Sequence, residues 1–553
     1  MAERDDDVTM APSDLAEIQA AINLRIEMEQ AGRKPGQVPE IDTRFVLQCL
    51  DANELGDGLL YAALHKNKFV FAKGSDCWYV WDRHSWRRDE MDLAVAAVEN
   101  VALRYAEEIE VQGGKLAEAM KDPSDDGKAV QRGIRNRIDQ LQKRISRLRK
   151  DSGRQNCLKF AHTNPVLPLA IRAADFDLNP WLLACANGVI NLKTGELEPG
   201  RHEDYISKRA RASFNGIKVD TSFWSEILLA IYSGDDQLVK YMRRLYGYGL
   251  TGLNIEHVFP VLVGRGRNGK SLVVEAISNA LGDYAGPVPA EMLLDSARST
   301  TAGGTSPEIM ALKGMRLAIA SETDEGRRFS AAKVKWLTGG DSLTGRGLYD
   351  KHLITFQPTH LLMLLTNHKP NAPDTDYAFW ERCFLVDHRL SFVDRAEGEE
   401  LKPHERLADK SLPTQLKERA DIILAWLVIG CLEWQQLGLS PPKSVRDATR
   451  GYQEDENYIG QFLEAVCTQG QGLQVSASEL YEAFVHWFKA NINPKERYTP
   501  SQKAFGQKLQ ATEMFERVRT SGYYHYKGLE VSREYRAAMS ANVTKGDDPP
   551  WRG

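Results

Sequence analysis

The run from residue 264 to residue 271, Gly-Arg-Gly-Arg-Asn-Gly-Lys-Ser, constrains this chain more than any other feature. It satisfies GxxxxGK[ST], in which backbone N–H groups wrap a polyphosphate and glycines keep side chains out of the way. Lys270 is placed to reach the β- and γ-phosphates, and Ser271 to offer its hydroxyl to Mg²⁺. We therefore expect an ATP and Mg²⁺ site formed by Gly264, Arg265, Gly266, Arg267, Asn268, Gly269, Lys270, Ser271 and Leu272.

The residues on either side of this loop fit a strand and a helix. The apolar run Val261 to Val263 precedes the loop, and one helical stripe follows it at Leu272, Val273, Ala276, Ile277, Ala280 and Leu281. The N-terminus of that helix would face the phosphates. Pro260 counts against a central strand because proline has no N–H for the ladder. Strands alternate with helices over residues 231–440, which predicts a parallel α/β sheet.

Two further apolar runs end in polar residues. MRLAIAS is followed by Glu322, which would bind Mg²⁺ through water and polarise the attacking water, and Asp324 and Glu325 compete for that role. LLMLLT is followed by Asn367, whose amide either holds the attacking water against the γ-phosphate or serves only as a turn residue. If the two runs are neighbouring strands of one sheet, these groups meet at one edge.

Arg382 follows Asn367 by fifteen residues, in DYAFWER. A guanidinium supplied by a neighbouring subunit would neutralise charge on the transferring phosphate. The alternative is a surface salt bridge, and Arg389 is the reserve candidate.

The rest of the chain divides by composition. Residues 1–40 mix charged and small residues, as a flexible arm does. Residues 41–230 are expected to form a mixed α+β domain that begins with an aromatic, strand-like stretch. Residues 441–538 carry two amphipathic helical stretches and then a probable hairpin, as in a winged helix or in a generic helical domain. Residues 539–553 are expected to be a disordered tail.

A basic helix is predicted over residues 129–150. Its apolar stripe is Ile134, Ile138, Leu141, Ile145 and Leu148. Eight cations occupy the other faces, either as a solvated surface or as a surface that meets DNA or another subunit: Arg132, Arg135, Arg137, Lys143, Arg144, Arg147, Arg149 and Lys150.

The net charge is only -5, from 71 basic and 76 acidic residues, so any nucleic-acid surface must be local. Seven scattered cysteines without a CxxC pair indicate reduced, mostly buried thiols of an intracellular protein. No apolar run approaches the roughly 18 to 20 residues of a membrane span, and the first residues are acidic, unlike a signal peptide. These features predict a cytoplasmic protein without a membrane partner.

Several segments carry a family resemblance. They are WYVWDRHSW, NPWLLACANGVINLKTGELEPGRHEDYISK, LYGYGLTG, GRGRNGKS, the run from ASETDEGRRFS to LLMLLTNHKPN, and DYAFWERC. Together, over residues 70–530, the chain resembles superfamily 3 helicases of the AAA+ branch, and more closely the phage and plasmid primase-helicases related to the poxvirus D5-type replication helicase. The resemblance implies an AAA+ P-loop core at residues 231–440, a collar domain before it and a winged helix after it. It also implies a hexameric DNA helicase that moves 3′ to 5′ on single-stranded or forked DNA during replication, with a separate primase or replisome proteins as partners.

The resemblance also places a channel hairpin between Glu322 and Asn367. Cations there can grip phosphates and an aromatic ring can stack on a base. The residues at its tip and flanks are Arg346, Tyr349, Lys351 and His352, although Lys351 could instead be a solvated turn lysine.

The chain departs from the family pattern in two ways. Ser321 stands where relatives often carry a second acid, and about 40 residues precede the matched region, too few for a primase domain. Asp175 and Asp177 superficially resemble a two-metal site, but we assign them to the helicase's own N-terminal domain, so primer synthesis is not expected. Two alternatives remain: an origin-binding initiator that uses ATP mainly for assembly, and a packaging motor, which should carry a nuclease-like carboxylate cluster that we do not find.

Overall fold

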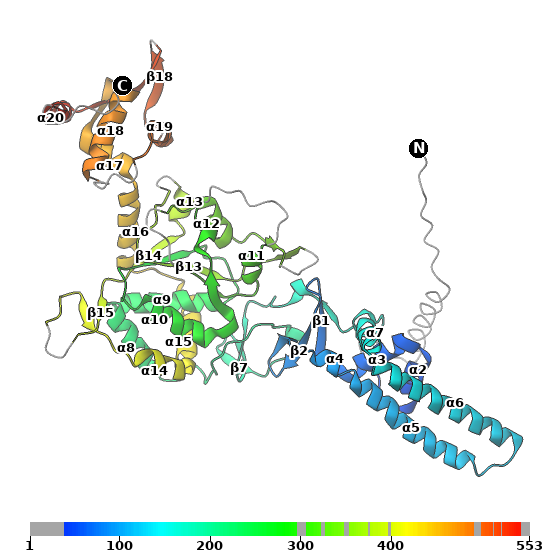
Figure 1. Ribbon diagram of the computed structural model, residues 1–553. Helices are drawn as coiled ribbons and strands as arrows, with labels where there is room; N and C mark the ends of the chain where they lie inside the picture. The colour runs from blue at the N-terminus through cyan, green and yellow to red at the C-terminus, as the bar shows by residue number, and fades with distance from the viewer. Residues whose placement is uncertain are drawn as a thin grey trace, which may run out of the picture.

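The computed structural model describes residues 38–295, 306–321, 327–347, 353–373, 376–395, 400–491, 499–512, 514–520 and 522–543. The molecule is elongated (Figure 1). A central α/β body carries a projecting helical hairpin at one end and a small C-terminal unit at the other.

The N-terminal part combines helices with a small sheet in the order β3-β2-β1-β4. Strands β1 to β3 form an antiparallel meander, and β4 runs parallel to β1. The helices α5 and α6 form the projecting hairpin (Figure 1). The bounds are α2 Thr43–Asp51, α3 Asn53–His65, β1 Phe69–Lys73, β2 Cys77–Asp82, β3 Ser85–Arg88, α4 Leu93–Ala96, α5 Glu99–Ala119, α6 Asp125–Leu148, α7 Asp151–Thr163 and β4 Ala170–Arg172.

The basic residues of α6 mostly pair with acids of the same part of the chain. Leu141, Ile145 and Leu148 are buried, as the stripe predicts. The guanidinium of Arg144 donates to Asp57 over 3.0 Å, and both side chains are nearly buried. Further pairs join Arg137 to Asp51, Arg147 to Glu54 and Arg149 to Glu99. These contacts favour a role in holding α6 to α2 and α3 over a role at a DNA surface.

Replacing Arg144 with methionine should lower the free energy of unfolding by about 3 kcal/mol, because a buried carboxylate loses its partner. Burial raises the pKa of Asp57 to about 6, against the lowering effect of Arg144. The matched control is Arg147→Met, since Arg147 is exposed and should change stability by less than about 1 kcal/mol. Urea unfolding curves measure both variants, and equal losses would contradict the assignment.

The central body contains a five-stranded parallel sheet, as the alternation of strands and helices predicts. Its order is β14-β8-β13-β10-β9. Alternate residues of β13 enter two cores, so both faces of the sheet are covered. The strands are β8 Phe259–Val263, β9 Ala285–Val288, β10 Leu317–Ser321, β13 Leu361–Thr366 and β14 Cys383–Asp387.

Three smaller sheets and several helices surround this sheet. In the smaller sheets β6 pairs with β5 and β7, β11 pairs with β12, and β15 pairs with β16. The strands are β5 Leu182–Cys185, β6 Gly188–Asn191, β7 Glu196–Glu198, β11 Leu343–Gly345, β12 Ile354–Phe356, β15 Ser391–Val393 and β16 Glu405–Leu407. The helices are α8 Ser222–Ile231, α9 Asp236–Leu250, α10 Lys270–Leu281, α11 Pro307–Ala311, α12 Ala331–Thr338, α13 Tyr377–Trp380, α14 Leu412–Glu418 and α15 Ala420–Leu437.

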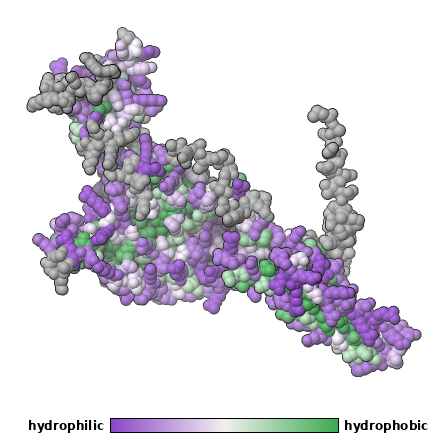
Figure 2. Space-filling model, viewed as in Figure 1, coloured by the Kyte–Doolittle hydropathy of each residue, from purple (hydrophilic) through white to green (hydrophobic). Residues whose placement is uncertain are grey.

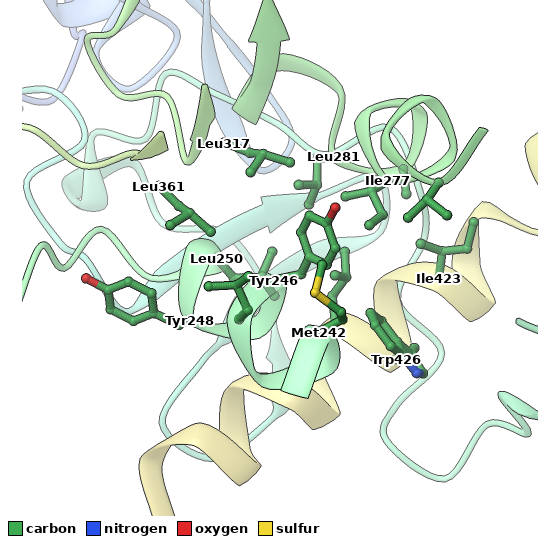
Figure 3. Packing of buried hydrophobic residues seen from close by; sticks show 14 of the residues in the cluster. Met242, Tyr246, Tyr248, Leu250, Ile277, Leu281, Leu317, Leu361, Ile423 and Trp426 are labelled. Atoms are coloured by element: carbon green, nitrogen blue, oxygen red, sulfur yellow. The ribbon is translucent and has the colours of Figure 1, made fainter. Parts of the chain in front are cut away.

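Helix α15 packs against α9 and α10 in the core of the body. Figure 3 shows Ile423 and Trp426 of α15 beside Met242 and Tyr246 of α9 and Ile277 of α10. By length and composition α15 could cross a membrane, so the expectation that no apolar run is long enough was wrong. Half of the helix is buried within the body, as in the core helix of a globular protein. The same core also takes in residues from Leu183 to Tyr232, so packing is continuous across residue 230.

The C-terminal unit follows α16 Lys443–Glu456, which lies against β14. It contains the predicted hairpin, β18 with β19, and a third strand, β17, that the sequence did not indicate. The elements are α17 Tyr458–Val466, β17 Cys467–Ser476, α18 Ala477–Asn491, α19 Gln502–Ala511, β18 Glu516–Thr520, β19 Tyr523–Val531 and α20 Arg533–Val543. All seven cysteines of the chain are free thiols and five are buried, as expected.

Candidate nucleotide site

The phosphate loop joins the carboxyl end of β8 to the first residue of α10. A Cβ on Gly264 would lie 1.9 Å from the Nδ2 of Asn268 and 2.7 Å from the carbonyl oxygen of His388. Gly269 has φ +83° and directly precedes α10. The loop therefore requires glycine at both positions, for space at one and for backbone conformation at the other.

Pro260 is accommodated at the start of β8. Strand β8 lies between β14 and β13, but its pairing with β13 begins only at Val261. The N–H of Phe259 donates toward β14, so the nitrogen of Pro260 points toward β13 at a level where that ladder has not yet begun, which removes the objection that the sequence raised.

Lys270 is a buried residue, 5% exposed as a whole, and its ammonium bonds within the loop. It donates to the carbonyl of Gly264 over 2.6 Å and to Oδ1 of Asn268 over 3.0 Å, and Oδ1 of Asn367 lies 3.5 Å away. All three acceptors are uncharged. Burial lowers the pKa of Lys270 to about 8. A desolvated cation held only by neutral oxygens favours an anionic ligand such as a polyphosphate.

Beside the loop lies His388, which follows β14. Its backbone N–H donates to the carbonyl of Val263 over 2.8 Å. Burial, together with the charge of Lys270, lowers the pKa of His388 to about 3, so its ring is neutral. Among the described residues, Nε2 of His388 and Nδ2 of Asn268 are buried without a hydrogen-bond partner. His388 was not predicted as a site residue, although a polar residue directly after an apolar strand was a signal that could have identified it.

The affinity for a non-hydrolysable ATP analogue should fall above about pH 8. Below that pH Lys270 is charged in the free protein. Above it the neutral amine of Lys270 must take up a proton when the nucleotide binds, so the affinity drops by up to about tenfold for each pH unit. In the Lys270→Arg variant the guanidinium keeps its charge, so the affinity should stay flat over the same range. Calorimetric titrations between pH 7 and pH 10 test this, and parallel curves for the two proteins would contradict it.

The structure brings Asn367 to the same edge of the sheet as Lys270. Strand β13, which ends at Thr366, lies between β8 and β10. Ser321 ends β10 and pairs with Leu365, so the segment after β10 also begins at this edge. Glu322, Asp324 and Glu325 themselves lie outside the described residues. Ser271 is exposed in the first turn of α10, and its role as a Mg²⁺ ligand stays a prediction.

Arg382 lies at the opposite end of the parallel strands, where β8 and β14 begin. It precedes β14, and its carbonyl accepts a 2.6 Å hydrogen bond from the N–H of Phe259, the first residue of β8. The five residues of β8, or roughly 16 Å of parallel strand, separate this end of the sheet from the phosphate loop. The guanidinium donates to the carbonyl of Ala378 over 2.7 Å. Arg382 is therefore remote from the Lys270 of its own chain, whereas Arg389 follows β14 at the loop's edge and is paired with Asp387.

The hairpin expected between Glu322 and Asn367 corresponds to the antiparallel pair of β11 and β12. Arg346 directly follows β11, and its carbonyl accepts from the N–H of Ser306 over 2.9 Å. Tyr349, Lys351 and His352 lie outside the described residues. The DNA contacts of all four stay predictions.

Asp175 and Asp177 have structural partners. Asp175 is ion-paired with Arg172, and Asp177 accepts from the backbone N–H and hydroxyl of Ser207. No group of three or more potential metal ligands occurs in the part of the chain that the structure describes.

Comparison with known protein families finds a match for the N-terminal region. Residues 58–232 match the family described as D5 N terminal like. We call residues 58–232 the D5 N terminal like domain because of this similarity. That match confirms the D5-type relationship that the sequence motifs indicate.

Curated relatives of the chain are viral. "Putative helicase L207/L206" of Acanthamoeba polyphaga mimivirus is 27% identical over 451 residues, which cover 78% of this chain and 45% of the relative. "Putative helicase 022R" of Frog virus 3 (isolate Goorha) is 25% identical, with 57% and 39% covered. "Putative primase C962R" of African swine fever virus (strain Badajoz 1971 Vero-adapted) is 23% identical, with 58% and 34% covered. The chain thus spans less than half the length of these relatives.

Among solved structures, the apo structure of the NrS-1 C terminal region (305-718) matches with a TM-score of 0.41 and 10% identity. The match covers 86% of this chain and 99% of that chain.

Arg316 joins the D5 N terminal like domain to the parallel sheet. It is buried directly before β10, and its guanidinium donates to the carbonyls of Asn179, Pro180 and Leu182 over 3.3 to 3.4 Å. The strand that leads to Glu322 is therefore fixed to the D5 N terminal like domain at its other end.

Proposed function

We propose that the chain is an ATP-hydrolysing DNA helicase that works as a hexameric ring and moves 3′ to 5′ on single-stranded DNA. It would act in the replication of a phage, plasmid or other mobile element, in the cytoplasm of the host cell. One observation carries the proposal: the Lys270 ammonium lies between the phosphate loop and Asn367 and has only neutral acceptors. The relatives named as helicases support the same class of activity.

ATP with Mg²⁺ fits the residues present. The glycine positions leave the loop backbone open, and the unpaired Nδ2 of Asn268 is a spare donor for a ligand. Lys270 would hold the β- and γ-phosphates, while Ser271 and Glu322 would hold Mg²⁺, which neutralises charge on the phosphates. Asn367 would orient the attacking water. A ring would bring the Arg382 of a neighbouring chain to the nucleotide site. The Arg382 of the same chain lies too far from that site to act there.

Strand displacement on forked DNA tests this function. A duplex with a 3′ single-stranded tail should be separated over its whole length when ATP is supplied, and one with only a 5′ tail should not. Stalling after local opening would favour the alternative, an origin-binding initiator that uses ATP mainly for assembly. Failure to separate any substrate, with ATP hydrolysis intact, would contradict the helicase assignment.

A further inference from the structure

Helix α19 presents a polar stripe without any acidic residue. Lys503, Gln507 and Gln510 are exposed, and spacings of four and three put them on one face of the helix. Phe505 and Leu509 are buried on the opposite face, in the core of the C-terminal unit. The stripe thus offers one ammonium and two carboxamides to a partner.

The β18–β19 hairpin lies beside this stripe. The hydroxyl of the buried Tyr526 lies 3.1 Å from where a Cβ on Gly506 of α19 would be. Tyr526 is paired across the strands with Arg517. Because directly paired residues lie on one face of a sheet, the face that touches α19 also carries Arg517. Arg519 and its partner Tyr524 continue that face toward the turn.

The two arginines are held over one aromatic ring. The Cζ of Arg517 lies 3.8 Å from the ring centroid of Tyr524, and that of Arg519 lies 5.7 Å away. Neither arginine forms an ion pair within the described residues. The Nε of Arg519 donates to the carbonyl of Gly522 over 3.5 Å, and stacking leaves the terminal nitrogens of both guanidiniums available to phosphate oxygens.

The local charge fits a polyanion. Residues 502–531 contain five lysines and arginines against three glutamates, whereas the whole chain has a net charge of -5. On the face that Figure 2 shows, the described part of the C-terminal unit is mainly hydrophilic. A nucleic acid therefore suits this surface better than an apolar protein partner does.

We propose that this surface, the exposed face of α19 together with Arg517 and Arg519, binds double-stranded DNA. The major groove, about 12 Å wide, admits an α-helix, and glutamine and lysine side chains can hydrogen-bond to base edges there. Arginines on the adjoining hairpin would contact the neighbouring phosphates. This duplex site is separate from the single-strand contacts of the proposed ring and would hold the chain at the duplex to be opened.

Fluorescence anisotropy of the full chain with labelled duplex, without ATP, tests the proposal. The Arg517→Ala/Arg519→Ala variant should bind duplex roughly tenfold more weakly, and the slope of log affinity against log salt should fall by about 2, one for each lost phosphate contact. The control is Arg533→Ala on α20, a helix held to α18 by the pair of Arg536 with Glu479. It removes a similar charge elsewhere and should change neither quantity.

A second variant tests the same surface without changing the hairpin, because the two arginine substitutions could disturb the fold of the hairpin. Gln507→Glu alters only an exposed side chain of α19 and places a carboxylate against the DNA, so it should also weaken duplex binding by about tenfold or more. Wild-type duplex affinity in both variants, or a loss confined to single-stranded DNA, would overturn the proposal. Duplex binding by the Lys270→Ala variant should stay intact, which separates this site from the proposed ATPase.

Discussion

Replacement of Lys270 by alanine is expected to abolish ATP hydrolysis and strand separation together. The ammonium bonds within the phosphate loop, to Gly264 and Asn268, and would neutralise charge on the γ-phosphate together with Mg²⁺ and the Arg382 of a neighbour. Loss of one such group from a preorganised site lowers turnover by roughly a hundredfold or more. A phosphate-release assay measures the effect.

The control for this variant is Lys240→Ala, which removes an exposed lysine of α9 that is paired with Asp236. It should leave turnover unchanged. Melting curves of both proteins separate lost chemistry from lost folding. Hydrolysis retained by a folded Lys270→Ala protein would remove the assignment of the phosphate site.

Replacement of Arg382 by alanine should leave ATP binding intact and reduce turnover by about three powers of ten or more, as for an arginine supplied in trans. The expectation rests on its position at the far edge of the sheet, away from its own phosphate loop. Single-turnover hydrolysis and nucleotide titration measure the two quantities. The matched control is Arg389→Ala, at the loop's own edge, which should have the smaller effect.

Subunit mixing distinguishes a borrowed arginine from a structural one. Arg382→Ala protein mixed with Glu322→Gln protein should regain part of the activity, because some sites then combine an intact Glu322 with an intact Arg382 from the next subunit. A structural defect around Ala378 would not be complemented in this way. An unaltered rate in the Arg382 variant would rule out its role.

The motif spacing allowed the centre of the fold to be predicted. A loop of fixed spacing needs a strand before it and a helix after it, and β8 and α10 are found there. The apolar runs before Glu322 and Asn367 were predicted as strands, and the structure pairs them as β10 and β13. Local patterns sufficed because buried parallel strands are continuous apolar runs.

Other features depend on contacts that no local pattern reveals. Strand β17 contains two glycines and three exposed glutamines around a register shift, and it is a strand because it pairs with β19, far along the chain. The cations of α6 looked like a possible DNA surface until their partners on α2, α3 and α5 were known. His388 acquires its place beside Lys270 only when β14 is placed next to β8.

The central claim is that Lys270 and Asn367 of one chain and Arg382 of the next meet on a single nucleotide. Electron microscopy of the protein with an ATP analogue and forked DNA tests this most directly. We predict a closed ring with one DNA strand in its channel and an Arg382 guanidinium against the terminal phosphate of each neighbouring site. Single, unassembled chains under these conditions, or a ring in which Arg382 points away from every nucleotide, would contradict the claim.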